Sequence, residues 1–451
     1  AFQAILRAGC VVVPVNPMSL ADEIAYMSED SGAKIAIVGA ELLERFSAPT
    51  SAKVRLLVAA YGEGILEPCP FKLPAVVEGS RLPAPMPPGA TAWGEAIGRR
   101  LAPRPDAGRW EDLAIMPYTS GTTGRPKACM HPHASAVFTA FAQVEWYGLT
   151  GDSVVTAFMP LFHVAGLNLL LTCLHAGACA VVAPKFDPQQ ANALIAQHRA
   201  SLFVEFAPML GQLLDAAGGG SLDTLRVVSG LDTPETIGRF ISACPHARFY
   251  AAFGQTETSG FVTMAAYGDR PGSAGLPMFM NAVAVVDESD RPLPPGETGE
   301  IVVRGPGVFE GYWNLPDDTA STFRNGWHHT GDTGAFDGDG YLFYKGRSAA
   351  KELIKPGGEN VYPAEVESAL KAHPAVEEAI VFGVPDKDWG EAVKAVCTLH
   401  SGASATADEI VAFVATRIAR YKRPKHLVLA DALPRKADGA PDRAKVKADF
   451  A

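Results

Sequence analysis

Short apolar runs alternate with amphipathic segments over most of the chain. Residues 1–7 have the spacing of the end of an amphipathic helix, and the apolar run 11–13 indicates a buried strand. A second helix is predicted from a cap at 19–22 to about residue 29, and a strand follows at 35–38. Because strands that alternate with helices build parallel sheets, this order predicts a doubly wound α/β fold.

The same alternation returns further along the chain. Residues 68–90 are rich in proline and have the composition of a surface connection, and a second α/β stretch runs from about 113 to 265. Within it, the apolar run 180–182 predicts a buried strand and the pattern over 188–199 predicts a helix. The doubly wound pattern therefore occurs twice and predicts more than one sheet.

The pattern changes near residue 280. Short apolar strands, such as 283–286 and 300–304, are separated by turns rich in Pro and Gly up to about residue 345. We expect these strands to form a small β-barrel attached to the large α/β region.

The C-terminal part returns to a mixed pattern. Strands are predicted at 378–383 and 393–399, and a helix at 407–420, which indicates a small α+β domain. We therefore expect a large domain over residues 1–346 and a small, mobile domain over residues 347–451. Because Ala1 opens the chain within a helical pattern, the N-terminal part of the large domain is expected to be missing from this sequence.

Composition narrows the possible functions. The chain has 451 residues and a net charge of −10, so it is a poor general binder of nucleic acid or of anionic membranes. No apolar run reaches the length of about 18 residues that a transmembrane helix needs. The seven cysteines form no CxxC pair and no zinc-type cluster. Scattered cysteines of this kind are typical of buried thiols in the reducing cytoplasm.

The strongest chemical signal is the segment Tyr118-Thr119-Ser120-Gly121-Thr122-Thr123-Gly124-Arg125-Pro126-Lys127. Glycines let backbone N–H groups approach an anion closely, hydroxyl groups add donors, and lysine adds positive charge. The segment lacks the spacing of a Walker A loop. A solvated linker is the alternative, but the crowding of these residue types indicates a polyphosphate-binding loop.

This segment resembles the phosphate loop of the adenylate-forming superfamily, which includes acyl-CoA synthetases. The resemblance covers nearly the whole chain, because further motifs follow in the order of that family. It implies an ATP-dependent acid–thiol ligase that converts a carboxylic acid to an acyl adenylate and then to acyl-CoA, with release of pyrophosphate and AMP. It also implies phosphate binding by Thr119, Ser120, Gly121, Thr122, Thr123, Gly124 and Lys127.

The pentapeptide Phe253-Gly254-Gln255-Thr256-Glu257 resembles a second motif of the same superfamily. The resemblance implies that Phe253 stacks on adenine, that Thr256 contacts the α-phosphate, and that Gly254 lines the acyl site. It assigns Glu257 to Mg²⁺, and a carboxylate suits a hard cation that bridges phosphates.

Two further segments resemble the ribose and adenine sites. In Thr330-Gly331-Asp332, the resemblance makes Asp332 the acceptor for both ribose hydroxyls, although such a tripeptide alone is more often a turn. Gly230 occupies the strand end beside adenine, where the following Leu231 is bulkier than the usual residue. Arg347 is implied as a ligand of ribose or phosphate. The spacing from Arg347 to the following lysine–glutamate pair is two residues longer than in commoner members of the superfamily.

The segment after Arg347 resembles the hinge and the CoA-side loop of the superfamily. Lys351 occupies the hinge position, and Gly357 and Gly358 begin the loop. A pair of glycines permits close approach of backbone to a thin ligand such as a pantetheine arm. The alternative is a glycine-rich turn before the helix that begins at Pro363.

The segment 159–167 resembles the acyl side of the site. His163 stands where members that activate amino acids often have an aspartate that pairs with the substrate ammonium. No other aspartate occurs in this segment, so a fatty or aromatic acid is expected. A lone histidine among apolar residues is usually a packed core residue, and a pocket or gating role for His163 is the competing interpretation.

The last motif departs from the family. In the loop 433–443, Ala440 occupies the position of the lysine that bridges the carboxylate and the α-phosphate during adenylation. Adenylation is therefore expected to be impaired. The alternatives are a nucleotide-binding protein without adenylation activity and an adenylation domain that serves a separate carrier protein. The expected partners are a small carboxylic acid, ATP, Mg²⁺ and CoA, and a homodimer is the expected assembly.

Overall fold

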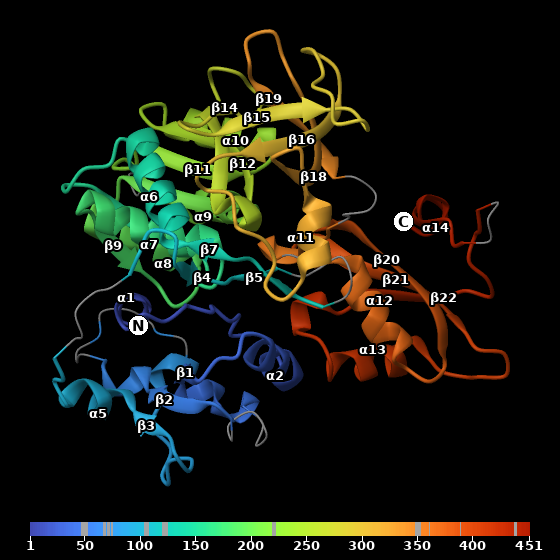
Figure 1. Ribbon diagram of the computed structural model, residues 1–451, viewed down its shortest axis with the longest axis horizontal. Coiled ribbons are helices and arrows are strands. Elements are labelled where there is room, and N and C mark those ends of the chain that lie inside the picture. Colours follow the sequence, from blue (N-terminus) through green and yellow to red (C-terminus); the bar gives the residue numbers. More distant parts are fainter. Residues whose placement is uncertain are drawn as a thin grey trace.

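The computed structural model describes residues 1–46, 53–65, 69, 73, 75–102, 108–119, 125–218, 222–347, 353–359, 361–387, 389–436 and 440–451. Figure 1 shows a central α/β body, an N-terminal unit beside it in blue and a C-terminal unit in orange and red. The phosphate-loop positions 120–124 and the hinge position 351 lie outside the described residues.

A seven-stranded sheet with the order β14-β13-β12-β11-β10-β8-β9 forms the centre of the body. Its five strands from β9 to β12 are parallel, and β13 and β14 add an antiparallel edge. The strands are β8 (Val154–Ala157), β9 (Cys179–Val182), β10 (Leu202–Phe206), β11 (Val227–Leu231), β12 (Arg248–Gln255), β13 (Gly260–Ala266) and β14 (Leu276–Pro277).

Helices cover both faces of this sheet, as a doubly wound fold requires. Side chains alternate between the two faces of a strand, so Phe203 and Val204 on β10 belong to different cores. Phe203 packs with α8 (Pro188–His198), α9 (Met209–Ala216) and α10 (Pro234–Ala243). Val204 packs on the opposite face with α6 (His133–Tyr147) and α7 (Val164–Ala176). The strand predicted at 180–182 and the helix predicted at 188–199 are confirmed.

The N-terminal unit contains a parallel three-stranded sheet, β1-β2-β3. Its elements are α1 (Phe2–Arg7), α2 (Ala21–Asp30), β1 (Ile35–Gly39), η1 (Ala40–Arg45), β2 (Arg55–Ala59), η2 (Tyr61–Glu63), α4 (Ala75–Glu78), β3 (Thr91–Ala92) and α5 (Trp93–Gly98). The predicted strand 11–13 is wrong, because only Val12 forms a bridge, to Ile115. The helix begins within the predicted cap segment: Leu20 is the N-cap residue, and its N–H donates to Glu23 Oε2 at 2.8 Å.

The strands predicted as a small β-barrel form a five-stranded antiparallel sheet. The order is β15-β16-β18-β17, with β19 paired to β18. These strands are β15 (Ala282–Val286), β16 (Gly299–Arg304), β17 (Phe323–Arg324), β18 (Trp327–Phe336) and β19 (Leu342–Arg347), and the helix α11 (Pro316–Thr322) precedes β17. Because β18 pairs with both β16 and β19, it lies inside the sheet and holds its residues rigidly.

The C-terminal unit has a three-stranded sheet, β20-β21-β22, with helices on both faces. Its elements are η5 (Pro356–Gly358), α12 (Pro363–Lys371), β20 (Val376–Asp386), β21 (Gly390–Leu399), α13 (Ala407–Ala415), η6 (Arg420–Lys422), β22 (His426–Leu429) and α14 (Arg443–Phe450). The helix predicted over 407–420 ends at Ala415. The hydroxyl of Thr416 donates to the carbonyl of Phe413 at 2.8 Å, a local bond that competes with helix continuation.

The structure bears on the burial of the cysteines and on membrane-spanning helices. Cys129, Cys173, Cys244 and Cys397 are buried thiols, but Cys10 and Cys179 are exposed, so the expectation of buried cysteines holds only in part. Among the described residues, no helix is both long and apolar enough to cross a membrane.

A fully buried carboxyl group, that of Glu205 on β10, leads to a stability prediction. Burial, and secondly the neighbouring Asp232, raise the pKa of Glu205 well above its usual range. A group with a raised folded-state pKa stabilises the fold below its unfolded pKa, and this stability is lost as the pH rises toward the folded pKa. Glu205→Gln, which stays neutral, should therefore melt at a higher temperature than the parent, by a margin that grows from pH 5 to pH 8.

Between pH 5 and pH 8, the difference in the free energy of unfolding between Glu205→Gln and the parent grows by as much as about 1.4 kcal/mol per pH unit. Thermal melts at pH 5, 6, 7 and 8 measure it. Glu377→Gln, at an exposed position on β20, is the control and should show no such trend. A margin for Glu205→Gln that is constant across these pH values would contradict the prediction.

Candidate functional site

The two ends of the phosphate-loop segment pair with each other. β5 (Tyr118–Thr119) pairs antiparallel with β6 (Lys127–Ala128), so Thr119 lies opposite Lys127. These two strands, with Arg125 and Pro126, are called the phosphate hairpin below. A second pair, β4 (Leu113–Ile115) with β7 (His131–Pro132), flanks this hairpin in the sequence. Lys127 is buried, and its ammonium pairs with the carboxylate of Asp318 on α11. It also lies 5.3 Å from the ring centre of Tyr312.

Glu257 lies directly after β12, in the short helix η3 (Thr256–Thr258). Its Oε1 accepts a 2.8 Å hydrogen bond from the hydroxyl of Tyr312. Burial, and then the Glu257 charge, raise the pKa of Tyr312, so the phenol remains a donor at neutral pH. The carbonyl of Thr256 lies 2.7 Å from Nε2 of His131. Burial lowers the pKa of His131 to about 4, so the ring is neutral and Nε2 is the donor in this bond.

Asp332 lies on β18 and is almost fully buried. Its Oδ2 accepts a 3.1 Å bond from Nε2 of Gln255, and its Oδ1 accepts one of 3.2 Å from the Tyr344 hydroxyl. Nε of Arg347 pairs with the same Oδ1 at 3.0 Å. The ring of Tyr344 lies 5.9 Å from that of Phe253 between centroids. The predicted adenine, ribose and Arg347 positions are therefore neighbours.

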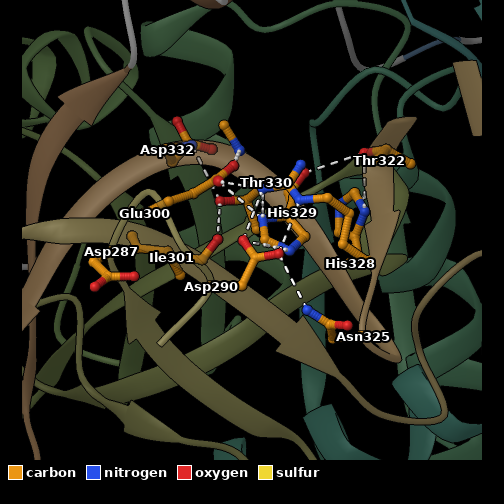
Figure 2. A network of polar contacts seen from close by, with 12 residues as sticks. Asp287, Asp290, Glu300, Ile301, Thr322, Asn325, His328, His329, Thr330 and Asp332 are labelled. Carbon is orange, nitrogen blue, oxygen red and sulfur yellow. Dashed lines mark hydrogen bonds and ion pairs between the residues drawn. The ribbon is translucent and has the colours of Figure 1, made fainter. Parts of the chain in front are cut away.

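Charged groups behind Asp332 fix the course of β18 (Figure 2). Glu300 Oε1 accepts the N–H of Gly331 at 2.9 Å, and its Oε2 lies 2.8 Å from Nδ1 of His329. Arg324 contacts Glu300 at 3.4 Å and binds Asp290 through two bonds of 3.1 Å. Since these contacts hold the residues just before Asp332, they position the Asp332 carboxylate.

One cavity is lined by residues from several of these motifs, although not by Phe253 or Asp332, and is called the nucleotide cavity below. Its lining includes Thr119 and Lys127 from the hairpin, Glu257 after β12, and Arg347 at the end of β19. The other lining residues are Gln255, Glu300, Tyr312, Asp318, Ser321, Thr322, Arg324, His329, Thr330 and Tyr362. Residues predicted from separate motifs therefore meet around one space.

A second cavity, called the interface cavity below, lies where the N-terminal unit, the body and the C-terminal unit meet. His163, which precedes α7, lies 3.2 Å through Nε2 from Oε2 of Glu359. Glu359 follows the Gly357 turn directly, so the predicted acyl-side histidine meets the predicted CoA-side loop. The lining is Pro14, Asn16, Ser19, Glu23, Met27, Tyr118, Thr119, Pro126, Phe162, His163, Thr256, Glu359, Tyr421 and Lys422.

Three of the predicted glycines have structural reasons of their own. A Cβ on Gly230 would lie 2.0 Å from the carbonyl oxygen of Glu205, and one on Gly254 would lie 2.0 Å from that of Gly260. Both glycines are thus needed for close strand packing. Gly357 has φ +60°, a conformation that favours glycine, and its N–H donates to the carbonyl of Trp389 at 2.8 Å. Gly358 is the last residue of η5.

Ala440 is not placed with the nucleotide cavity residues. It is exposed, and its carbonyl accepts the N–H of Lys436 at 2.8 Å. Leu433 and Val446, which flank it, pack on one face of the small sheet with Ile380 and Phe382 of β20. Residues on either side of Gly357 pack on the opposite face, with Val381. The Ala440 loop and the Gly357 loop therefore lie on opposite faces of the β20-β21-β22 sheet.

Other predicted positions lie outside the described residues: Ser120, Gly121, Thr122, Thr123, Gly124 and Lys351. Conversely, the prediction missed Tyr312, Asp318, Tyr344 and Tyr362. Tyr312 and Asp318 stand in no motif; Tyr312 forms a bridge with Cys129, and Asp318 lies on α11. Tyr344 and Tyr362 lie near recognised motifs. An aromatic residue beside an anion-binding motif is a feature from which both could have been predicted as site residues.

Comparison with known families gives two matches along the chain. Residues 1–313 match the model of the AMP-binding enzyme family, and residues 365–440 match that of the AMP-binding enzyme C-terminal domain. The first match alone covers more than half of the chain.

Curated relatives carry the names of acid–CoA ligases. The chain is 37% identical to a feruloyl-CoA synthase of an Amycolatopsis species over 351 residues, which is 75% of this chain and 70% of the relative. It is 31% identical to the long-chain-fatty-acid–CoA ligase FadD13 of Mycobacterium tuberculosis over 453 aligned positions, which is 97% of this chain and 83% of the relative.

Two solved structures of the o-succinylbenzoate CoA synthetase of Bacillus subtilis are similar to the chain at 27% identity. A double mutant bound to a CoA product analogue matches with a TM-score of 0.81 over 99% of this chain and 85% of that one. The complex with the acyl-adenylate intermediate matches with a TM-score of 0.61 over 97% and 83%. The cavity that unites the motif residues and the two family matches lead to one conclusion: the chain belongs to the AMP-binding enzyme family and is an ATP-dependent, AMP-forming acid–CoA ligase.

Proposed function

We propose that this ligase activates a fatty or aromatic carboxylic acid that carries no ammonium group, and that it does so in two steps at the nucleotide cavity. The observation that carries the proposal is the meeting of Lys127, Glu257 and Arg347 in one cavity, since these residues come from three separate motifs. The relatives that are named for feruloyl-CoA and for long-chain fatty acids support the same class of acid.

In the first step, a carboxylate oxygen of the acid attacks the α-phosphorus of ATP. The bond from the α-phosphorus to the bridging oxygen breaks, and pyrophosphate leaves with the electron pair. Asp332 would accept hydrogen bonds from the ribose hydroxyls, and Lys127 would neutralise phosphate charge after exchange of its Asp318 partner. Catalysis by such groups consists of orientation and charge neutralisation.

Glu257 is the proposed protein ligand of Mg²⁺. Its carboxylate lines the same cavity as Lys127, and carboxylate oxygen suits this hard cation. Among the described residues, no group of three or more His, Cys, Asp and Glu side chains is placed to hold a metal. A single carboxylate such as that of Glu257 would fit a cation that takes its other ligands from the bound nucleotide and water. When bound, Mg²⁺ would neutralise charge on the phosphates that leave.

In the second step, the CoA thiolate attacks the carbonyl carbon of the acyl adenylate. The bond to the phosphate oxygen breaks, and AMP leaves with the electron pair. The small unit, residues 347–451, would rotate about Lys351 between the steps and would present the Gly357 loop for this one. The contact of Glu359 with His163 supports a position of that loop beside the acyl site, and we propose a gating role for His163 on this basis.

The comparison with the two solved complexes supports this arrangement. The chain fits the CoA-analogue complex better than the acyl-adenylate complex of the same synthetase, with TM-scores of 0.81 and 0.61. Sequence identity and coverage are nearly equal in the two comparisons, and we attribute the difference in TM-score to the relative position of the units. The presence of Tyr362 in the lining of the nucleotide cavity supports the proposal that the Gly357 face of the small sheet is turned toward this cavity.

The exclusion of amino acids rests on charge. A buried ammonium group needs a carboxylate partner, and segment 159–167 contains no aspartate or glutamate. His163 stands there instead, and its partner Glu359 belongs to the loop that moves with the small unit. An acid with an apolar chain or ring meets no such requirement.

A screen of carboxylic acids by CoA-dependent AMP formation tests the proposed function. Dodecanoic, ferulic and cinnamic acids should produce AMP and the matching thioester, and phenylalanine should produce neither. The control omits CoA and should yield pyrophosphate and bound adenylate without turnover. A preference for phenylalanine, or transfer to a carrier protein but not to CoA, would refute the proposal.

A further inference from the structure

A buried group of three charges crosses the boundary between the N-terminal unit and the C-terminal unit. Nζ of Lys422, in η6, lies 2.6 Å from Oε1 of Glu23 on α2 and 2.6 Å from Oε1 of Glu365 on α12. The three side chains are only 6–11% exposed. Beside them, Nδ2 of Asn16 donates to the hydroxyl of Tyr421 at 3.4 Å. Opposite charges at such distances and burial attract each other strongly.

Two of the three charged residues lie in the C-terminal unit, and one lies in the N-terminal unit. Lys422 and Glu365 both lie in the C-terminal unit, so their bond persists when that unit rotates. Glu23 lies on the other side of the boundary, so its bond to Lys422 forms only in one arrangement. This asymmetry makes Glu23 the member that distinguishes the arrangements.

Helix α2 presents Glu23 from a fixed position. The hydroxyl of Tyr118 donates to Asp30 Oδ2 at 2.6 Å, and the hydroxyl of Tyr26 donates to the carbonyl of Pro126 at 3.0 Å. Nε1 of Trp313 donates to the carbonyl of Asp30 at 2.9 Å. Since Tyr118 and Pro126 belong to the phosphate hairpin, α2 is anchored to the nucleotide cavity at one end. Figure 1 shows the helix on the side of the N-terminal unit that faces the C-terminal unit.

We infer that Glu23 is a positioning residue for thioester formation. Its bond to Lys422 holds the C-terminal unit with the Gly357 loop turned toward the nucleotide cavity, and thereby raises the population of enzyme that can accept CoA. The inference rests on the proposed two-step function. It assigns to Glu23 no contact with reacting atoms.

Glu23→Gln is the variant of choice, because glutamine keeps an oxygen that can accept the N–H of Leu20 and cap α2, but it removes the charge. Asp22→Asn is the matched control, since it removes one acidic charge from the same helical turn at an exposed position. Both variants are tested in the full chain with synthetic dodecanoyl adenylate and feruloyl adenylate as probes.

For Glu23→Gln, we expect the apparent KM for CoA in thioester formation to rise about tenfold, with recovery of the rate at saturating CoA, because the competent fraction falls. Small-angle scattering without CoA should show a shift away from the arrangement described here. Pyrophosphate release from ATP and acid should be unchanged or faster. Asp22→Asn should match the parent in all three measurements.

The outcomes separate this inference from the proposed function. If the parent enzyme forms no thioester from either adenylate, the proposed function fails. If the parent does so, and Glu23→Gln shows the parent's KM and scattering profile, the inference on Glu23 is overturned. A fall in kcat that saturating CoA does not restore, with unchanged scattering, would also overturn it, because a positioning role acts through the population.

Discussion

Ala440→Lys is expected to raise the rate of pyrophosphate release from ATP and acid about a hundredfold, the typical effect of one preorganised charge on a transition state. The variant restores a cation at the position that the family uses to steady negative charge during adenylation. The effect should fall on the first step alone, because Ala440 lies across the small sheet from the Gly357 loop that serves the second. Single-turnover assays of each step measure the difference.

The neighbouring lysines provide the controls. Lys436, whose N–H bonds to the Ala440 carbonyl, and Lys445 on α14 have long side chains that could substitute in place. If the parent enzyme adenylates fast and Lys436→Ala or Lys445→Ala abolishes this, the cation comes from that neighbour. If Ala440→Lys changes neither step and neither neighbour matters, the assignment of this loop is wrong.

Glu257→Gln is expected to lower adenylation about a hundredfold at limiting Mg²⁺, since it removes the proposed protein ligand of the cation. The fold should persist, because glutamine can still accept the hydrogen bond from Tyr312. Pyrophosphate release over a series of Mg²⁺ concentrations measures the change, and excess Mg²⁺ should recover part of the rate.

Glu310→Gln is the control. It changes an exposed carboxylate that does not line the nucleotide cavity, and it should behave as the parent. Thermal melting of Glu257→Gln establishes that the loss is not one of folding. An unchanged Mg²⁺ dependence with normal pyrophosphate release would remove Glu257 from the metal site.

The predicted elements that matched best have a strong local pattern. The strand at β9 and the helix α8 were predicted within one residue, because the spacing of their apolar residues is a local feature. The predicted strand around Val12 failed for a different reason. An extended segment becomes a strand only if a partner pairs along it, and Ile115, far away in the sequence, pairs with one residue only.

The residues of the candidate site also fall into two groups, those that a local sequence pattern predicts and those that it does not. Phe253, Glu257 and Asp332 were identified because they belong to motifs, and a motif is contiguous in sequence. Tyr312 and Asp318 contact two of the assigned residues, Glu257 and Lys127, but they come from a segment without such a pattern. Their role depends on the bridge from Tyr312 to Cys129 and on the contact of α11 with Lys127, which no local pattern encodes.

The hydrogen bonds around Asp332 have a consequence for nucleotide affinity. Both carboxylate oxygens already accept bonds from the chain: Gln255 on Oδ2, and Tyr344 and Arg347 on Oδ1. The ribose hydroxyls would have to replace these donors of the chain. The free energy that the ribose contributes to binding is therefore the difference between the bonds it makes and the bonds it displaces. The same competitors can return as a nucleotide departs, which lowers the barrier to its escape. A ligase that must discharge AMP in every cycle benefits from an anchor that is easily displaced.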